Sequence, residues 1–190
     1  KIQQWHKLLN DAGVPTESLS NYQSMKWSKA FLNIVGNATS AILNRPPEVI
    51  YKTDSLFDLE KRMLRETLEV MDALKIKVID LPGSPATKLS FGVRRAPNMV
   101  LKPILTNIVA KGRGEKMPSF QIDLMAGKGK TEVIYHNGAI AKAGRAHNIP
   151  TPVNTALTNI LVGLARQEID WRDYDGKPAK LLAEVKQFEK

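Results

Sequence analysis

The chain has 190 residues, of which 43% are hydrophobic and 25% charged, values that are typical of a globular domain and exclude disordered and collagen-like chains. It has no cysteine, which excludes cysteine-based zinc sites, redox motifs and nucleophiles and fits a reducing, cytoplasmic location. The net charge of +9 fits an anionic partner, but with 6% aromatic residues and no long basic run we expect no nucleic-acid binding. No apolar run approaches the ~20 residues of a membrane helix, so no membrane partner is expected either.

Helical periodicity dominates the chain. The first predicted helix has Trp5, Leu8 and Leu9 at helical spacing and ends before Gly13. Further helices are predicted, in chain order, over residues 23–44, 56–74, 85–95, 98–110, 118–125, 132–147 and 153–167, and from Pro178 onward. The best candidate strand is Lys75–Ile79, followed by a turn at residues 80–83, and residues 111–117 form a glycine-bearing loop.

We therefore predict a single all-α domain over residues 1–190. Because Lys1, not methionine, leads directly into a helical pattern, the chain is expected to be a fragment.

Motifs for common cofactors are missing or incomplete. The glycine fingerprint of a dinucleotide-binding unit is absent. Gly129-Lys130-Thr131 matches only the end of a phosphate-binding loop, since Leu124 stands where the first glycine should be. The three histidines, His6, His136 and His147, have no metal-ligand spacing, so no metal site is expected.

Polar residues recur along one face of the predicted helix 23–44. Lys29, Asn33 and Asn37 follow each other at i, i+4 spacing, and Ser40 and Asn44 continue the row. Asparagine is a mediocre helix former, so the row suggests hydrogen bonding to a polar ligand. The alternatives are a plain exposed polar face, or asparagine side chains that satisfy a neighbouring helix.

Two polar residues stand out in the second half of the chain. Ser119 follows Pro118 at a predicted helix start, and Glu132 lies at the start of another helix. A carboxylate there is favoured by the helix dipole by about 0.3–1 kcal/mol, so each residue alone also has a structural explanation.

Taken together, three segments resemble the signature motifs of the ketopantoate reductases (2-dehydropantoate 2-reductases). They are Met25–Asn33 with Asn37 and Asn44, Pro118–Asp123 with Gly127 and Thr131–Ala139, and Ala146–Asn154. The first is similar to the W-x-K-L-x-x-N-x-x-x-N helix of that family. The resemblance spans about Trp5 to Leu164 and covers the C-terminal domain of the family, without its N-terminal Rossmann domain.

The resemblance implies an all-helical substrate domain like that of 6-phosphogluconate-dehydrogenase-like enzymes. It also implies NADPH-dependent reduction of 2-dehydropantoate, a small 2-oxo acid, to (R)-pantoate in pantothenate biosynthesis. NADPH would be bound mainly by the N-terminal Rossmann domain, so the fragment alone is expected to be inactive, and a homodimer is plausible, as in many relatives.

The resemblance also assigns roles by motif. Lys29 would be the general acid at the substrate carbonyl, and Glu132 would accept a hydrogen bond from the substrate hydroxyl and tune Lys29. Asn33 and Asn37 would hold substrate oxygens, and Ser119 would bind the carboxylate. Lys29 and Glu132 are then expected to face one cleft that opens toward the Rossmann domain.

The chain departs from the family pattern in three places. The stretch from Asp123 to Glu132 is about one residue longer than usual, Ala30 replaces the usual leucine after the lysine, and residues 111–116 look like a subfamily feature. The alternatives are a reductase of the same architecture that acts on another small 2-oxo or 3-oxo acid, and a stand-alone helical binding domain that uses its basic surface.

Overall fold

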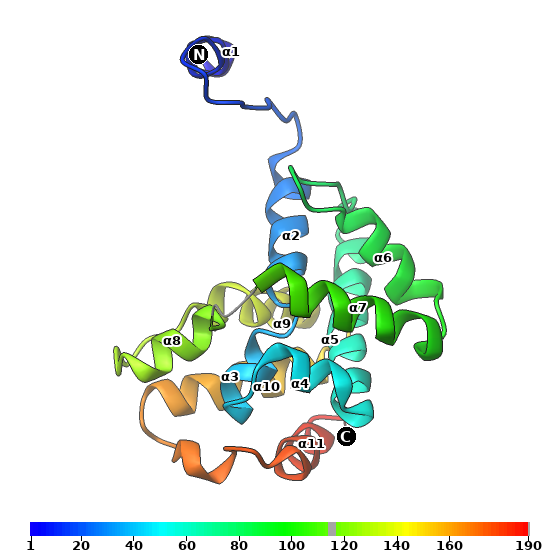
Figure 1. Cartoon of the computed structure of the whole chain (residues 1–190), viewed down its shortest axis with the longest axis vertical. Coiled ribbons are helices and arrows are strands. Elements are labelled where there is room, and N and C mark those ends of the chain that lie inside the picture. The colour runs from blue at the N-terminus through cyan, green and yellow to red at the C-terminus, as the bar shows by residue number, and fades with distance from the viewer. Residues whose placement is uncertain (114–116, 190) are drawn as a thin grey trace.

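The regular structure is helical throughout the part of the chain that the computed structural model describes, residues 1–113 and 117–189 (Figure 1). Apart from the helices, that part has one isolated bridge between Leu81 and Ser84. The helices are α1 (Ile2–Asp11), α2 (Tyr22–Asn33), α3 (Ala38–Leu43), α4 (Pro47–Lys52), α5 (Asp54–Ala73), α6 (Ala86–Arg95), α7 (Asn98–Arg113), α8 (Ser119–Met125), α9 (Asn137–Ala146), α10 (Pro152–Ala165) and α11 (Pro178–Gln187), with 3-10 turns η1 (Glu132–Tyr135) and η2 (Trp171–Asp173). The all-α prediction is confirmed. None of these helices is long and apolar enough to cross a lipid bilayer.

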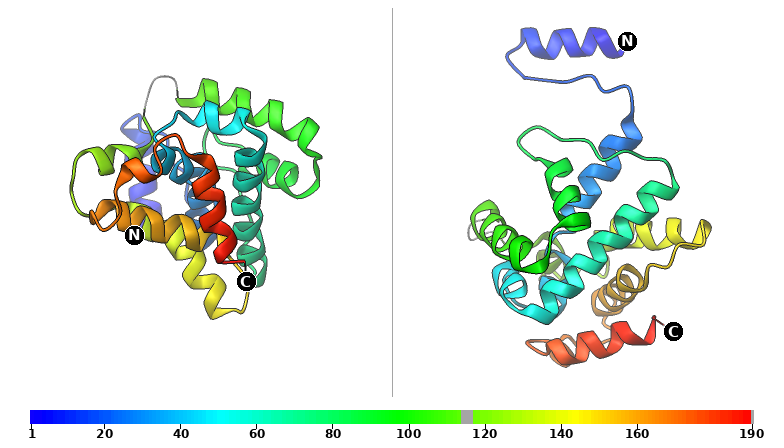
Figure 2. Two further views of the ribbon diagram at one scale, coloured as in Figure 1. Left: turned by 90° about the horizontal axis from the view of Figure 1, so that it is seen from below. Right: turned by 90° about the vertical axis from the view of Figure 1, so that its right-hand side faces the viewer.

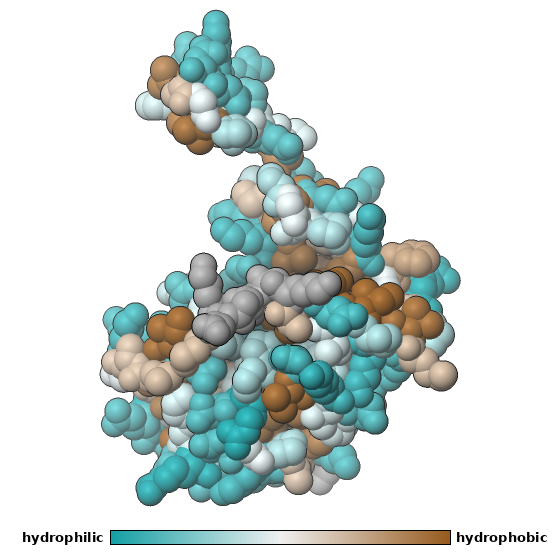
Figure 3. Space-filling view, viewed as in Figure 1, coloured by the Kyte–Doolittle hydropathy of each residue, from teal (hydrophilic) through white to brown (hydrophobic). Residues whose placement is uncertain are grey.

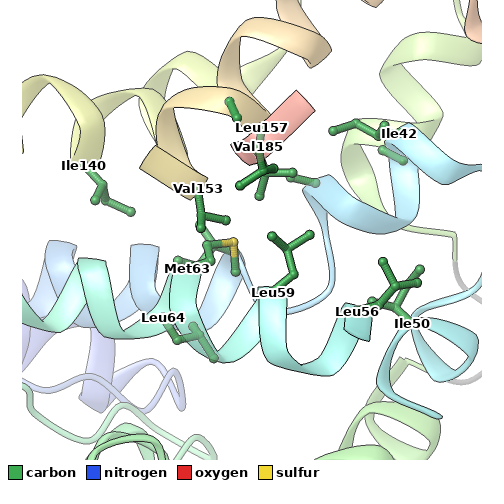
Figure 4. Packing of buried hydrophobic residues seen from close by; sticks show 14 of the residues in the cluster. Ile42, Ile50, Leu56, Leu59, Met63, Leu64, Ile140, Val153, Leu157 and Val185 are labelled. Atoms are coloured by element: carbon green, nitrogen blue, oxygen red, sulfur yellow. The ribbon is translucent and has the colours of Figure 1, made fainter. Parts of the chain in front are cut away.

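Helix α5 is the centre of the core. Its Leu59 and Met63 lie close to Val153 and Leu157 of α10 and to Val185 of α11 (Figure 4), and all five side chains are almost fully buried. Burying a side chain of this size stabilises the fold by about 1.5–3 kcal/mol. The same cluster includes residues of α3, α4, α8 and α9, so one core holds the elements that carry the predicted site.

The predicted helix over residues 23–44 is wrong, because the chain breaks between α2 and α3. Gly36 lies in the break with a φ of +62°, a conformation that glycine adopts easily. Ser40 is fully buried in α3, so the five polar residues do not share one exposed helix face.

A buried carboxylate holds this break in place. Glu60 of α5 accepts hydrogen bonds from the Gly36 N–H (2.8 Å), the Tyr51 hydroxyl (2.9 Å) and the Thr39 hydroxyl (2.5 Å). The break itself and the helices α3 and α4 are therefore fixed to α5 at the point where the chain turns.

Other local predictions also need correction. The predicted strand Lys75–Ile79 is wrong: residues 76–80 have no regular structure, and the described residues include no strand with which they could pair. The predicted helix 132–147 is divided at His136 into η1 and α9. Helix α7 continues to Arg113, and the rest of the predicted loop at residues 114–116 lies outside the described residues.

Helix α1 projects away from the rest of the chain (Figures 1 and 2). It has no buried residue, and its apolar side chains Ile2, Trp5 and Leu8 are 57–74% exposed. Figure 3 shows apolar side chains uncovered on this helix. Nothing in the described part of the chain covers its apolar stripe.

Gly36→Ala is expected to destabilise the fold by about 2–3 kcal/mol, from left-handed backbone strain and overpacking together. A Cβ at Gly36 would lie 3.2 Å from Cβ of Pro47 and 3.2 Å from the ring of Tyr51. Gly83→Ala is the matched control, because Gly83 also has a positive φ but nothing within 4 Å of an added Cβ. Urea unfolding followed by circular dichroism measures the free energy of unfolding of both variants. Equal decreases would show that the contacts at Gly36 do not contribute to the loss.

Candidate active site

The break between α2 and α3 meets the start of α8 through one buried amide. Asn37 is 4% exposed, and its Nδ2 donates to the hydroxyl of Ser119 (3.1 Å) and to the backbone carbonyl of Asn33 (3.2 Å). Its Oδ1 accepts a hydrogen bond from the Phe120 N–H (3.3 Å). Residues 82 positions apart in the sequence, from two of the three motifs, are thus in direct contact.

The asparagines of the predicted row therefore do not all have the same role. The Asn37 amide is satisfied within the protein, so in this structure it orients Ser119. Ser119 itself is exposed, which leaves its hydroxyl accessible from outside. Asn44 joins elements in a similar way, since its Oδ1 accepts from Nε2 of Gln121 (2.7 Å) and its Nδ2 donates to Asp175 (3.2 Å).

Lys29 and Asn33 lie in the last turns of α2, just before the break. Lys29 is exposed and Asn33 is half-buried. No carboxylate within the described ranges makes an ion pair with Lys29. Its ammonium is therefore accessible to a ligand.

Glu132 is the first residue of η1, and its side chain is exposed. The preceding Thr131 caps this turn, since its hydroxyl accepts from the Val133 N–H at 3.3 Å. Glu132 lines a cavity of about 340 Å³ together with Lys130, Arg166 and other residues of the 123–135 segment and α10. The cavity thus has side chains of both signs, with Lys128, Lys130 and Arg166 on one hand and Glu132 and Asp123 on the other, and Lys29 is not among its lining residues.

His136 is a further residue of the site, and the sequence analysis considered it only as a metal ligand. Its ring lies against Phe120, with the ring centroids 5.8 Å apart, and burial lowers the pKa of the imidazole. The negative charge of Glu132 raises that pKa and the positive charge of Lys29 lowers it, so both predicted catalytic charges act on this one ring. The sequence feature that could have identified it is its position inside the second motif, four residues after Glu132.

The residues described here include no group of three or more His, Asp or Glu that could hold a metal ion. The site instead offers an ammonium, a hydroxyl, a carboxylate and amides. Such groups can bind a small polar anion and move a proton.

The comparison with known families decides the identity of the chain. Residues 21–165 match the family described as ketopantoate reductase PanE/ApbA C terminal. The chain belongs to this family. This membership confirms the resemblance of the three motifs.

Two curated relatives are named 2-dehydropantoate 2-reductase. The chain is 30% identical over 155 residues to a 2-dehydropantoate 2-reductase of Pyrobaculum aerophilum, covering 82% of this chain and 48% of that protein. It is 27% identical over 158 residues to the 2-dehydropantoate 2-reductase of Archaeoglobus fulgidus, covering 83% and 46%. The chain therefore spans about half the length of the curated relatives it matches.

Solved structures share the fold. A PanE/ApbA family ketopantoate reductase from Ralstonia eutropha JMP134 superposes with a TM-score of 0.68 at 23% identity, covering 87% of this chain and 49% of that one. A D-mandelate dehydrogenase in a ternary structure with NADH and anilino(oxo)acetate gives 0.64 at 20% identity, covering 87% and 61%. The fold of the chain thus occurs in oxidoreductases.

Proposed function

We propose that this chain is the substrate-binding and catalytic part of an NADPH-dependent 2-dehydropantoate 2-reductase. The observation that carries the proposal is the Asn37–Ser119 contact, which joins the end of α2, with Lys29, to the start of α8. Family membership supplies the reaction class, since the matched relatives are named 2-dehydropantoate 2-reductase. We propose further that a Rossmann domain outside this chain presents NADPH to the site.

The reaction needs a proton donor at the substrate carbonyl. Bound NADPH would supply a hydride to the carbonyl carbon, and negative charge would build up on the carbonyl oxygen. The Lys29 ammonium stabilises this charge and delivers the proton that completes the hydroxyl group. Because Lys29 is exposed and has no ion pair in the described part of the chain, it is accessible for this role.

The other polar residues orient the substrate. The Ser119 hydroxyl donates to the substrate carboxylate, while Asn37 holds Ser119 in place. Asn33 lies one helical turn after Lys29 and binds a substrate oxygen. Glu132 accepts a hydrogen bond from the hydroxyl that forms, and its negative charge favours the charged form of Lys29. Several such contacts together lower the entropic part of the barrier.

Exposed apolar side chains on α1, α6 and α7 suggest two contacts with other parts of the proposed enzyme. The uncovered stripe of α1 would pack against the Rossmann domain. Apolar side chains of α6 and α7 are exposed, among them Phe91, Met99 and Ile108 at 58–90%. Figure 3 shows apolar surface over these helices, which would support a homodimer. We propose that the reaction serves pantothenate biosynthesis in the cytoplasm.

The test is NADPH oxidation by the full-length protein with 2-dehydropantoate as substrate, followed by the near-ultraviolet absorbance of the reduced nicotinamide. We expect turnover by the full-length protein and none by residues 1–190 alone. A folded full-length protein that binds NADPH but does not reduce 2-dehydropantoate would reject the proposed substrate.

A second candidate is a reductase of the same architecture for another small 2-oxo or 3-oxo acid. The observation that favours it is Ala30, which lines a small pocket between α2 and α9 and stands where the family usually has leucine. A panel of oxo acids of graded side-chain size, assayed in the same way, separates the two candidates.

A further inference from the structure

Helix α8 carries Ser119 in its first turn and lies beside α3 (Figure 1). Asn37, directly before α3, binds the Ser119 hydroxyl and the Phe120 N–H. Asn44, directly after α3, accepts a hydrogen bond from Nε2 of Gln121 at 2.7 Å. Two asparagines at the two ends of α3 therefore hold three successive residues at the start of α8.

Two buried side chains anchor α8 to the rest of the domain. Phe120 lies in the core and Gln121 is 8% exposed, whereas Ile122 and Met125 are 50% and 64% exposed. A helix of about two turns is not stable on its own in water. The position of the Ser119 hydroxyl therefore depends on these two anchors and on the asparagines that bind the first turn of α8.

A segment between α10 and α11 completes the C-terminal end of α3. The last carbonyl groups of a helix have no hydrogen-bond partner within it. Here Nε1 of Trp171 donates to the carbonyl groups of Ala41 (2.9 Å) and Ile42 (3.0 Å). The Gly176 N–H donates to the carbonyl group of Leu43 (2.9 Å). This segment therefore caps α3 from about 130 positions later in the chain.

The same segment, residues 171–176 (the cap segment), also holds the side chain of Asn44. Nδ2 of Asn44 donates to Asp175 (3.2 Å), which also accepts from Nη1 of Arg45 (2.7 Å). The hydrogen bonds from Asn44 and Arg45 lower the pKa of Asp175, so its carboxylate is charged at neutral pH. Both polar atoms of the Asn44 amide are therefore used inside the protein, one toward Asp175 and one toward Gln121.

We propose that the cap segment positions Ser119 for substrate binding, through Asn44 and Gln121. Asp175 fixes the amide of Asn44, and Asn44 in turn fixes Gln121 in the first turn of α8. A shift of about 1 Å at a substrate-binding group can lower the rate about 10²-fold, so this position matters for the reaction. This inference rests on the proposed function, in which the Ser119 hydroxyl binds the substrate carboxylate. The cap segment lies beyond residue 165, where the match to the family ends.

The test is a double-mutant cycle in the full-length protein, with 2-dehydropantoate and NADPH. Asp175→Ala removes the acceptor for Asn44 at an exposed position, so we expect folding to be unchanged. It should lower kcat/KM about threefold to tenfold, the range of one hydrogen bond, mainly through a higher KM. In the Ser119→Ala background, the same substitution should change kcat/KM by less than about twofold, because the group that it positions is missing.

Three further variants complete the experiment. Gln121→Leu removes the donor on α8 but keeps a side chain of similar size, and should show the same dependence on Ser119. Asp175→Asn keeps an oxygen that accepts from Asn44, and should restore most of kcat/KM. Asp173→Ala is the matched control, because Asp173 is an exposed carboxylate of the same segment, and it should leave kcat/KM unchanged. Circular dichroism confirms that each variant is folded, and if Asp175→Ala does not fold, Gln121→Leu decides.

The outcomes separate the inference from the proposed function. If Asp175→Ala and Gln121→Leu lower kcat/KM equally with and without Ser119, or leave it unchanged, the cap segment does not position Ser119. The inference is then wrong, while the proposed function stands. If the folded wild-type protein binds NADPH but does not reduce 2-dehydropantoate, the proposed function fails and this inference fails with it.

Discussion

Lys29→Ala in the full-length protein is expected to lower kcat for 2-dehydropantoate reduction by about 10²- to 10⁴-fold, the usual contribution of a positioned general acid. Lys29 is exposed, and no ion pair within the described residues depends on it, so the fold should not change. The loss should appear in kcat as well as in kcat/KM, because the ammonium acts mainly on charge that develops during hydride transfer. NADPH oxidation under saturating substrate measures it.

Lys26→Ala is the matched control for this prediction. Lys26 is also an exposed lysine of α2, one turn earlier, but its ammonium lies over the Tyr22 ring. Its replacement should change kcat by less than about twofold, as for a surface position. If Lys29→Ala raises KM without lowering kcat, Lys29 only binds the substrate carboxylate. If Lys29→Ala unfolds the protein, its role is structural.

The sequence predicts the elements of this fold better than their connections. Helices α6, α8 and α10 occur close to their predicted bounds, because turn residues mark their starts: Pro85 directly precedes α6, Pro118 directly precedes α8, and Thr151-Pro152 begins α10. Such signals are local and depend on one or two residues.

The break between α2 and α3 could not be predicted in the same way. Residues 31–35 continue the apolar period of a helix through the position where the chain turns. The turn is instead held by Glu60, which lies 24 residues after Gly36 and accepts its N–H. A tertiary hydrogen bond of this kind leaves no mark in the local pattern.

The candidate site shows the same limit. The motif resemblance predicts both Asn37 and Ser119 as site residues, and the structure brings them into contact. The motif could not show that the amide of Asn37 is used inside the protein. His136 was missed as a site residue because its environment depends on Phe120, Glu132 and Lys29, which come from three different elements.

Glu66→Ala is expected to destabilise the domain by about 3–5 kcal/mol, because it leaves several buried donors without an acceptor. Glu66 of α5 is 7% exposed. Its carboxylate accepts hydrogen bonds from the Val153 N–H (2.8 Å), the Asn154 N–H (2.9 Å) and Nδ2 of Asn154 (2.7 Å). It therefore replaces the helix cap that the side chain of Thr151 does not provide for α10.

Urea unfolding followed by circular dichroism measures this loss, with Glu69→Ala as the control. Glu69 is an exposed carboxylate on the same helix, and its replacement should change the free energy of unfolding by less than about 0.5 kcal/mol. Equal effects of the two substitutions would show that the carboxylate of Glu66 does not cap α10.

The pH dependence gives a second test of the same carboxylate. Burial raises the pKa of Glu66 above its ordinary value of 4.5, although hydrogen bonds from Asn154 and Val153 oppose the shift. Between the ordinary and the raised pKa, the folded chain binds more protons than the unfolded chain. The Glu66 contribution to the free energy of unfolding therefore falls as the pH rises through this window.

Glu66→Gln removes this titration while it keeps the shape of the side chain. We expect the free energy of unfolding of the wild type, minus that of the variant, to be largest at low pH and to decrease as the pH rises above 4.5. Unfolding curves at several pH values measure the difference, in which the other titrating groups cancel. A difference that increases with pH would mean that the hydrogen bonds outweigh burial and hold the pKa of Glu66 below its ordinary value.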